Sequence, residues 1–179
     1  MIIKENNYAF IDSNNLYQGL SKDIEKKSRK IYSGWQLDYK RFRVYLKDKH
    51  GVGKAFLFIG FKPGNQAMYM KLQEYGYICV FKPTLELVDG TVKGNVDAEL
   101  VLHAMIEYFN FDRAVIVSGD GDFYCLVEYL INNSKLKKVL VPNQNNYSCL
   151  LDRLSSATNN ILSFVNPLRD KLEYKNNHK

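Results

Sequence analysis

The sequence from Asp112 to Phe123 reads D-R-A-V-I-V-S-G-D-G-D-F and places two carboxylates directly after a short apolar run. Ala114 to Val117 is unbroken and mostly β-branched, which is typical of a strand buried on both faces of a parallel sheet. Asp120 and Asp122 follow where that strand would end, and open α/β folds hold their chemistry at the carboxyl ends of strands. A divalent cation would offset the repulsion between the two acids. Alternatively, one aspartate caps the next helix and the other is solvated.

Two further aspartates are expected at the same edge of the sheet. Asp12 ends a first buried strand, Tyr8 to Asp12. Asp97 lies in the first turn of a helix expected to run to about Phe109, and helical spacing from it reaches apolar residues such as Val101 and Met105. Because right-handed crossovers bring the carboxyl ends of parallel strands to one edge, four acids are expected to converge: Asp12, Asp97, Asp120 and Asp122.

The rest of the chain alternates strand-like and helix-like segments, the pattern of a parallel sheet covered by helices. Further strands are expected at 54–61, 77–81, 137–141 and 161–165, helices at 65–75, 123–132 and 147–157, and a loop or small hairpin at 84–92. The polar residues from Leu168 to Lys179 read as a frayed helix or tail. The fold class is therefore α/β.

The composition is that of an ordinary globular domain with a modest basic excess. The 179 residues are enough for one domain, and the net charge of +6 permits an anionic partner such as nucleic acid without requiring one. Three widely separated cysteines lack zinc-site spacing, which favours a reduced, cytoplasmic compartment. No apolar run approaches the roughly 20 residues of a membrane span, so no membrane association is expected.

Basic residues crowd the segment from Ser21 to His50, with Tyr32, Trp35 and Tyr39 between them. One interpretation is a solvated basic helix that covers the sheet. The other is a surface that follows phosphates while bases stack on the aromatic side chains, and we favour it because of the acids elsewhere.

An oxygen-only group of four acids suits Mg²⁺ or Mn²⁺ rather than zinc. Such a site suits phosphodiester hydrolysis, in which one metal activates water and another stabilises the leaving oxygen. The sequence contains no nucleophilic triad, P-loop or dinucleotide fingerprint, so no organic cofactor is expected.

Three motifs together make the chain resemble the NYN domain, the LabA-like branch of the PIN-domain-like nucleases. They are F-I-D-S-N-N-L at 10–16, K-G-N-V-D at 93–97 and V-S-G-D-G-D-F at 117–123. The resemblance covers about 8–141 and implies a three-layer α/β sandwich of Rossmann-like topology, with a mainly parallel sheet of five or six strands. We expect a single domain over 1–179, with a basic insertion at 21–50 and a C-terminal helix or tail at 143–179.

The resemblance also implies a metal-dependent ribonuclease whose four aspartates bind Mg²⁺ or Mn²⁺. By position, Asn15 matches the amide beside the first acid and Ser118 the serine before the acid pair. The basic residues expected to contact RNA are Lys82 and Lys93 near the acids, with Lys40, Arg41 and Arg43 extending the path.

Our leading hypothesis is a metal-dependent endoribonuclease that acts on RNA. The alternative is a non-catalytic RNA-binding or regulatory NYN-domain protein, because a fold does not settle an activity. A phosphatase is a third reading, since acids separated by one residue occur in haloacid-dehalogenase-like enzymes, but that pair usually ends the first strand. A homodimer is left open.

Overall fold

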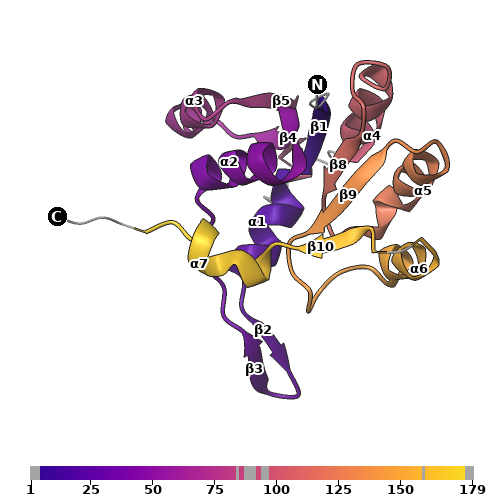
Figure 1. Ribbon diagram of the computed structural model, residues 1–179. Coiled ribbons are helices and arrows are strands. Elements are labelled where there is room, and N and C mark those ends of the chain that lie inside the picture. The colour runs from indigo at the N-terminus through magenta and orange to yellow at the C-terminus, as the bar shows by residue number, and fades with distance from the viewer. Residues whose placement is uncertain (1–4, 84, 87–91, 94–96, 159, 176–179) are drawn as a thin grey trace.

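The structure is a computed structural model and describes residues 5–83, 85–86, 92–93, 97–158 and 160–175 (Figure 1). The strands are β1 (Asn7–Asp12), β2 (Ile24–Lys26), β3 (Arg29–Tyr32), β4 (Val52–Phe61), β5 (Tyr77–Pro83), β6 (Leu85–Glu86), β7 (Val92–Lys93), β8 (Ala114–Val117), β9 (Leu136–Val141) and β10 (Leu162–Phe164). The helices are α1 (Ser13–Ser21), α2 (Tyr39–His50), α3 (Gln66–Glu74), α4 (Asp97–Ile106), α5 (Tyr124–Asn132), α6 (Cys149–Ala157) and α7 (Arg169–Leu172), with short 3₁₀ turns η1 (Gly121–Phe123) and η2 (Asn166–Leu168).

Six strands form one sheet in the order β10-β9-β8-β1-β4-β5, and every neighbouring pair is parallel. This confirms the α/β class and the parallel sheet. Of the loop or small hairpin expected at 84–92, residues 84 and 87–91 lie outside the described residues, and β6 pairs with β7 in antiparallel fashion. The central strands β1 and β8 lie side by side, which brings the ends of both acid-bearing strands together.

The helices form two layers, one on each face of the sheet (Figure 1), and alternation along β1 sends its side chains toward both. Tyr8 and Phe10 pack in one cluster with residues of α4, α5 and α6, whereas Ala9 and Ile11 pack in another with residues of α1, α2, α3 and α7. Burial of each large apolar side chain contributes about 1.5–3 kcal/mol to these cores. The result is the expected three-layer sandwich. Among the described residues, no helix has the length and apolar character to cross a membrane.

The segment from Ser21 to His50 differs from the expectation of a basic surface with stacking aromatics. Its first part is the antiparallel β2–β3 hairpin, which the sequence did not indicate. Trp35 is only 4% exposed and packs in the core, and burial raises the pKa of Tyr39 to about 12. Trp35 is therefore closed to a stacking base, whereas Tyr32 and Tyr39 are partly buried.

The described part of the C-terminal segment contains the short helix α7 and packs against the body of the protein. Leu172 is buried in the same cluster as Trp35, and its carbonyl accepts a hydrogen bond from the Asp38 amide at 2.8 Å. Tyr174 continues the contact by donating its amide hydrogen to the carbonyl of Gln36. The buried Leu172 therefore anchors the chain to the start of α2.

Candidate functional site

Asp12 occupies the junction between β1 and α1 and is 4% exposed. Its Oδ1 atom accepts the amide hydrogens of Asn14 at 3.1 Å and Asn15 at 3.0 Å, so the carboxylate itself caps α1. Its other oxygen, Oδ2, accepts a 3.4 Å hydrogen bond from the hydroxyl of Ser118. The cap fixes one oxygen of Asp12 and leaves the other facing the end of β8.

Two other acids act on Asp12 electrostatically. Burial is the largest cause of the raised pKa of Asp12, and the charges of Asp97 and Asp120 raise this pKa further, against the lowering effect of the Asn14 and Asn15 amides. Asp97 and Asp120 therefore lie close enough to Asp12 to disfavour its charge. The predicted convergence of these three carboxylates at one sheet edge agrees with this coupling.

The loop after β8 is held in place by residues that the resemblance had singled out. The Ser118 hydroxyl accepts the amide hydrogen of Asp120 at 3.1 Å, and Asn15 Oδ1 accepts that of Gly119 at 2.8 Å. Asp120 Oδ1 in turn accepts the amide hydrogen of Asp122 at 3.1 Å and caps η1. Asn15 and Ser118 thus connect α1, Asp12 and the acid-bearing loop.

Asp97 is the first residue of α4 and is partly buried. The fully buried side chains of this helix are Leu100 and Ala104, whereas Met105 is 38% exposed. Val101 and Tyr108 pack against the same core cluster as expected, and Asp97 lies three residues before the buried Leu100, on the same side. The expected start of this helix at Asn95 lies outside the described residues.

An open pocket of about 470 Å³ lies beside the acid-bearing loop, and its lining includes Asp120 and Asp122. A later segment, 146–148, forms its other wall, and the Ser148 amide donates to the Gly119 carbonyl at 2.9 Å. A Cβ added to Gly121 would lie 2.3 Å from Ser148 Oγ. The sequence did not identify 146–148 as part of the site. Glycines such as Gly121 indicate that another segment packs closely there, but they do not indicate which one.

The acids are neighbours without forming a closed ligand set. Over the ranges that the structure describes, no group of three or more His, Cys, Asp or Glu residues is close enough to hold one metal ion. Asp122 is exposed and Asp120 is partly buried, both on a surface loop. The structure therefore brings Asp97 and Asp120 near Asp12 but shows no metal geometry.

The predicted RNA-binding residues are placed unevenly. Lys82 lies at the end of β5 and pairs with Glu99 of α4 at 2.9 Å, whereas Lys93 is in β7. Lys40 is exposed, and Arg41 pairs with Asp38 at 3.4 Å at the start of α2. Arg43 is at the opposite edge from the acids, where its guanidinium donates to three carbonyls, those of Val52, Gly53 and Gly76.

The model of the NYN domain matches residues 8–160, a range that contains all four acids. The chain belongs to the NYN domain family. A solved structure of a protein of unknown function from Vibrio parahaemolyticus is similar to this NYN protein over 96% of the present chain and 98% of its own, with 25% identity and a TM-score of 0.68. No curated protein matches the sequence. Family membership places the chain among PIN-like nucleases, while the solved relative adds no activity.

Proposed function

We propose that this NYN protein is a metal-dependent endoribonuclease that hydrolyses RNA phosphodiester bonds at the Asp12 edge of the sheet. The observation that carries the proposal is the buried carboxylate of Asp12, whose pKa is raised by burial and by Asp97 and Asp120. Placing three interacting carboxylates together costs free energy unless a cation balances them. A buried aspartate whose pKa is raised by neighbouring acids, in a fold of this family, supports a functional site.

The donor chemistry fits Mg²⁺ or Mn²⁺, which prefer oxygen ligands. Because no three acids of the described residues are close enough to hold one ion together, Asp12, Asp97 and Asp120 would hold the metal partly through its bound waters, which Mg²⁺ usually keeps. Asp122 would do so directly or through water. The bound metal would supply a Lewis acid that activates water and neutralises charge on the leaving oxygen. Asn15 and Ser118 would keep the loop and Asp12 in register through the bonds described above.

RNA would enter from the pocket side, where Asp120 and Asp122 are accessible. Lys82 and Lys93 would contact phosphates near the acids, with Lys40 and Arg41 farther along the path. In the structure Lys82 is held by Glu99, so RNA phosphate would compete with that carboxylate. Arg43 faces the other sheet edge and would act on RNA only through the stability of α2.

The test is the Asp120→Asn variant, assayed for RNA cleavage with Mn²⁺ and after chelation. We expect cleavage to be abolished with the fold intact, because the amide keeps the size of the side chain and loses its charge. Asp48→Asn is the matched control, since Asp48 is exposed on α2. Unchanged cleavage by Asp120→Asn would refute the assignment, and chelator-resistant binding without cleavage of any RNA would favour the regulatory alternative.

A further inference from the structure

The segment from Lys22 to Tyr32, here called the basic hairpin, begins at the same sheet edge as the acids. It follows α1, whose Gly19 carbonyl accepts a 2.8 Å hydrogen bond from Asn143, just after the end of β9. A Cβ added to Gly19 would lie 2.7 Å from Pro142, so α1 and the end of β9 are in close contact. Figure 1 shows the β2–β3 hairpin projecting away from the rest of the molecule beyond this point.

The base of the basic hairpin is firmly attached to the core. The Leu20 carbonyl accepts hydrogen bonds from the Trp35 amide and the Tyr32 hydroxyl, both at 2.8 Å. Asp23 accepts the Gly34 amide hydrogen at 2.8 Å, and a Cβ on Gly34 would lie 2.1 Å from the Ser21 carbonyl oxygen. The two strands therefore leave the body at a fixed position.

The charge of the basic hairpin is not balanced within the protein. It carries five basic residues against Asp23 and Glu25, and Lys30 pairs with Asp23. Lys26 lies directly opposite Arg29 in the strand pairing, an arrangement that destabilises a sheet through repulsion. Within the described residues, Lys26, Lys27 and Arg29 form no ion pair.

The turn at the tip adds a second unfavourable feature. Lys27 and Ser28 have φ values of 50° and 59°, and a two-residue hairpin turn with both φ positive normally takes Asn-Gly. A lysine in the left-handed region costs backbone strain that Gly or Asn would largely avoid. Neither the strain nor the repulsion helps this hairpin to fold, and strained positions cluster at sites of function.

We propose that the basic hairpin binds the phosphate backbone of an RNA stem that flanks the cleavage site. The proposal rests on the proposed function for its choice of RNA. A stem is favoured over a single strand because the hairpin offers charge without a free aromatic face: Tyr32 is half-buried and its hydroxyl is bonded to Leu20. Single-strand binding relies on such stacking, whereas duplex RNA is recognised through its shape and phosphates.

The dimensions fit this role. Strands rise about 3.3 Å per residue, so the hairpin extends about 13 Å from its base to its tip. Lys26, Lys27 and Arg29 would therefore contact phosphates several nucleotides away from the phosphodiester bond that is cleaved beside Asp12. The substrate class that follows is structured RNA cut beside a stem.

The test variant is Lys26→Gln/Lys27→Gln/Arg29→Gln, which keeps the Lys30–Asp23 pair. The control is Lys47→Gln/Lys49→Gln/Lys71→Gln, an equal change in charge on exposed residues of α2 and α3. Binding of a fluorescent RNA stem-loop is measured by anisotropy in EDTA at several salt concentrations. We expect the slope of log affinity against log salt to fall by about 2–3 in the hairpin variant, because each phosphate contact contributes about 0.9.

A cleavage assay separates this proposal from the proposed function. With Mn²⁺, the hairpin variant should cut the stem-loop RNA about tenfold more slowly at sub-saturating RNA, yet cut a single strand of about four nucleotides at the wild-type rate. A salt slope that stays unchanged, or that falls equally in the control variant, overturns the hairpin proposal. If the wild type cleaves no RNA but the slope changes only in the hairpin variant, the nuclease proposal fails and the binding proposal stands. Thermal unfolding of both variants checks that the fold is kept.

Discussion

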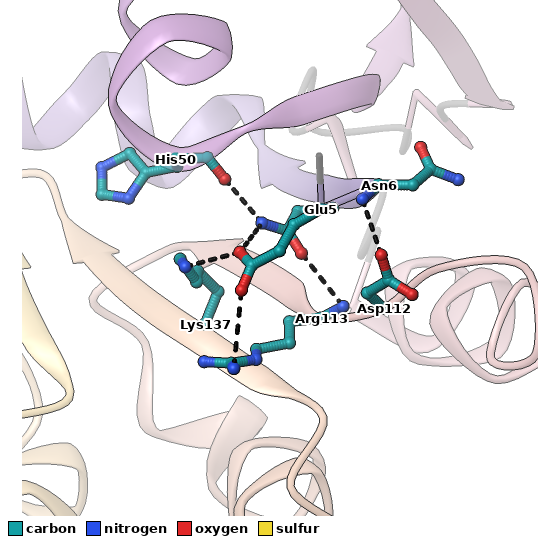
Figure 2. A network of polar contacts seen from close by, with 7 residues as sticks. Glu5, Asn6, His50, Asp112, Arg113 and Lys137 are labelled. Atoms are coloured by element: carbon teal, nitrogen blue, oxygen red, sulfur yellow. Dashed lines mark hydrogen bonds and ion pairs between the residues drawn. The ribbon is translucent and has the colours of Figure 1, made fainter. Parts of the chain in front are cut away.

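The two edges of the central sheet both carry polar clusters, but they differ in how the charges are balanced. At the amino edge, Glu5 accepts hydrogen bonds from Lys137 at 2.6 Å and from Asn7 at 2.9 Å, and it forms an ion pair with Arg113 at 3.5 Å (Figure 2). The Lys137 hydrogen bond is the main cause of a lowered pKa of Glu5. The ionised form of this acid therefore favours the fold.

At the carboxyl edge the balance is reversed. Asp12 is more deeply buried than Glu5, and its pKa is raised by burial and by neighbouring acids. In the described part of the chain, Asp12, Asp120 and Asp122 take part in no ion pair. One edge is built to stabilise the sheet, whereas the other keeps an arrangement that stability alone disfavours.

The largest expected effect is at the amino edge, in the variant Asn7→Ala. Asn7 is fully buried, donates to the His50 carbonyl at 2.7 Å and accepts the Arg113 amide hydrogen at 3.1 Å. Its loss leaves two backbone groups without partners, so the free energy of unfolding should fall by about 3 kcal/mol in urea titrations. Asn15→Ala, which removes one bond at the carboxyl edge, should cost about 1 kcal/mol. Equal losses would contradict the contrast between the two edges.

The sequence predicted the central sheet well because its strands are buried on both faces. Ala114 to Val117 is the observed β8 without any change of boundary, since an apolar run of that length has no competing helical period. Topology then placed Asp12 and Asp120 at neighbouring strand ends. Each prediction needed only a local pattern, namely an apolar strand followed within a few residues by an aspartate.

What the sequence did not show depends on distant contacts or unusual turns. The basic hairpin lacks apolar alternation and uses Lys27-Ser28 in place of a recognisable Asn-Gly turn. The pocket wall at 146–148 follows the acids by more than 20 residues, and no local pattern ties it to Gly121. Arg43 looked like its basic neighbours, because nothing local reveals its three carbonyl partners.

The next effect is the acid sensitivity of the amino edge, through His50. Burial lowers the pKa of His50 to about 4, helped by the charges of Lys49, Lys137 and Lys138, whereas the unfolded chain has a value near 6.5. The unfolded state therefore binds a proton first, and stability that is complete above about pH 6.5 is lost as the pH falls toward 4. The loss should be about 2–3 kcal/mol in urea unfolding between pH 7.5 and 4.5.

His50→Gln is the matched variant for this titration. It removes the ionisable ring, and its side-chain amide can still meet the Tyr45 hydroxyl, which lies 3.3 Å from His50 Nε2. We expect the variant to lose most of the pH dependence between 6.5 and 4.5. If the free energy of unfolding of the variant falls with pH as it does in the wild type, the acid sensitivity comes from another group. His50 would then not account for the pH dependence of the amino edge.

The smallest effect is expected at the carboxyl edge, in Asp12→Asn without metal. Asparagine caps a helix as well as aspartate does, so α1 keeps its cap, while the buried charge that opposes folding at neutral pH is removed. The free energy of unfolding should stay the same or rise by about 1 kcal/mol, the usual scale of a single substitution. A fall of more than about 1 kcal/mol in the free energy of unfolding would mean that the ionised Asp12 stabilises the fold, as Glu5 does.

Added Mn²⁺ should make the wild type more stable than Asp12→Asn. A metal that binds the folded state stabilises it by about 1.4 kcal/mol at ten times its Kd, so the wild type and the exposed-site control Asp48→Asn should both gain stability. Asp12→Asn should gain little, because one of the proposed ligands has lost its charge. The readout is thermal and urea unfolding, which needs no RNA substrate. Equal metal stabilisation in all three proteins would place the ion elsewhere and leave the raised pKa of Asp12 without a functional explanation.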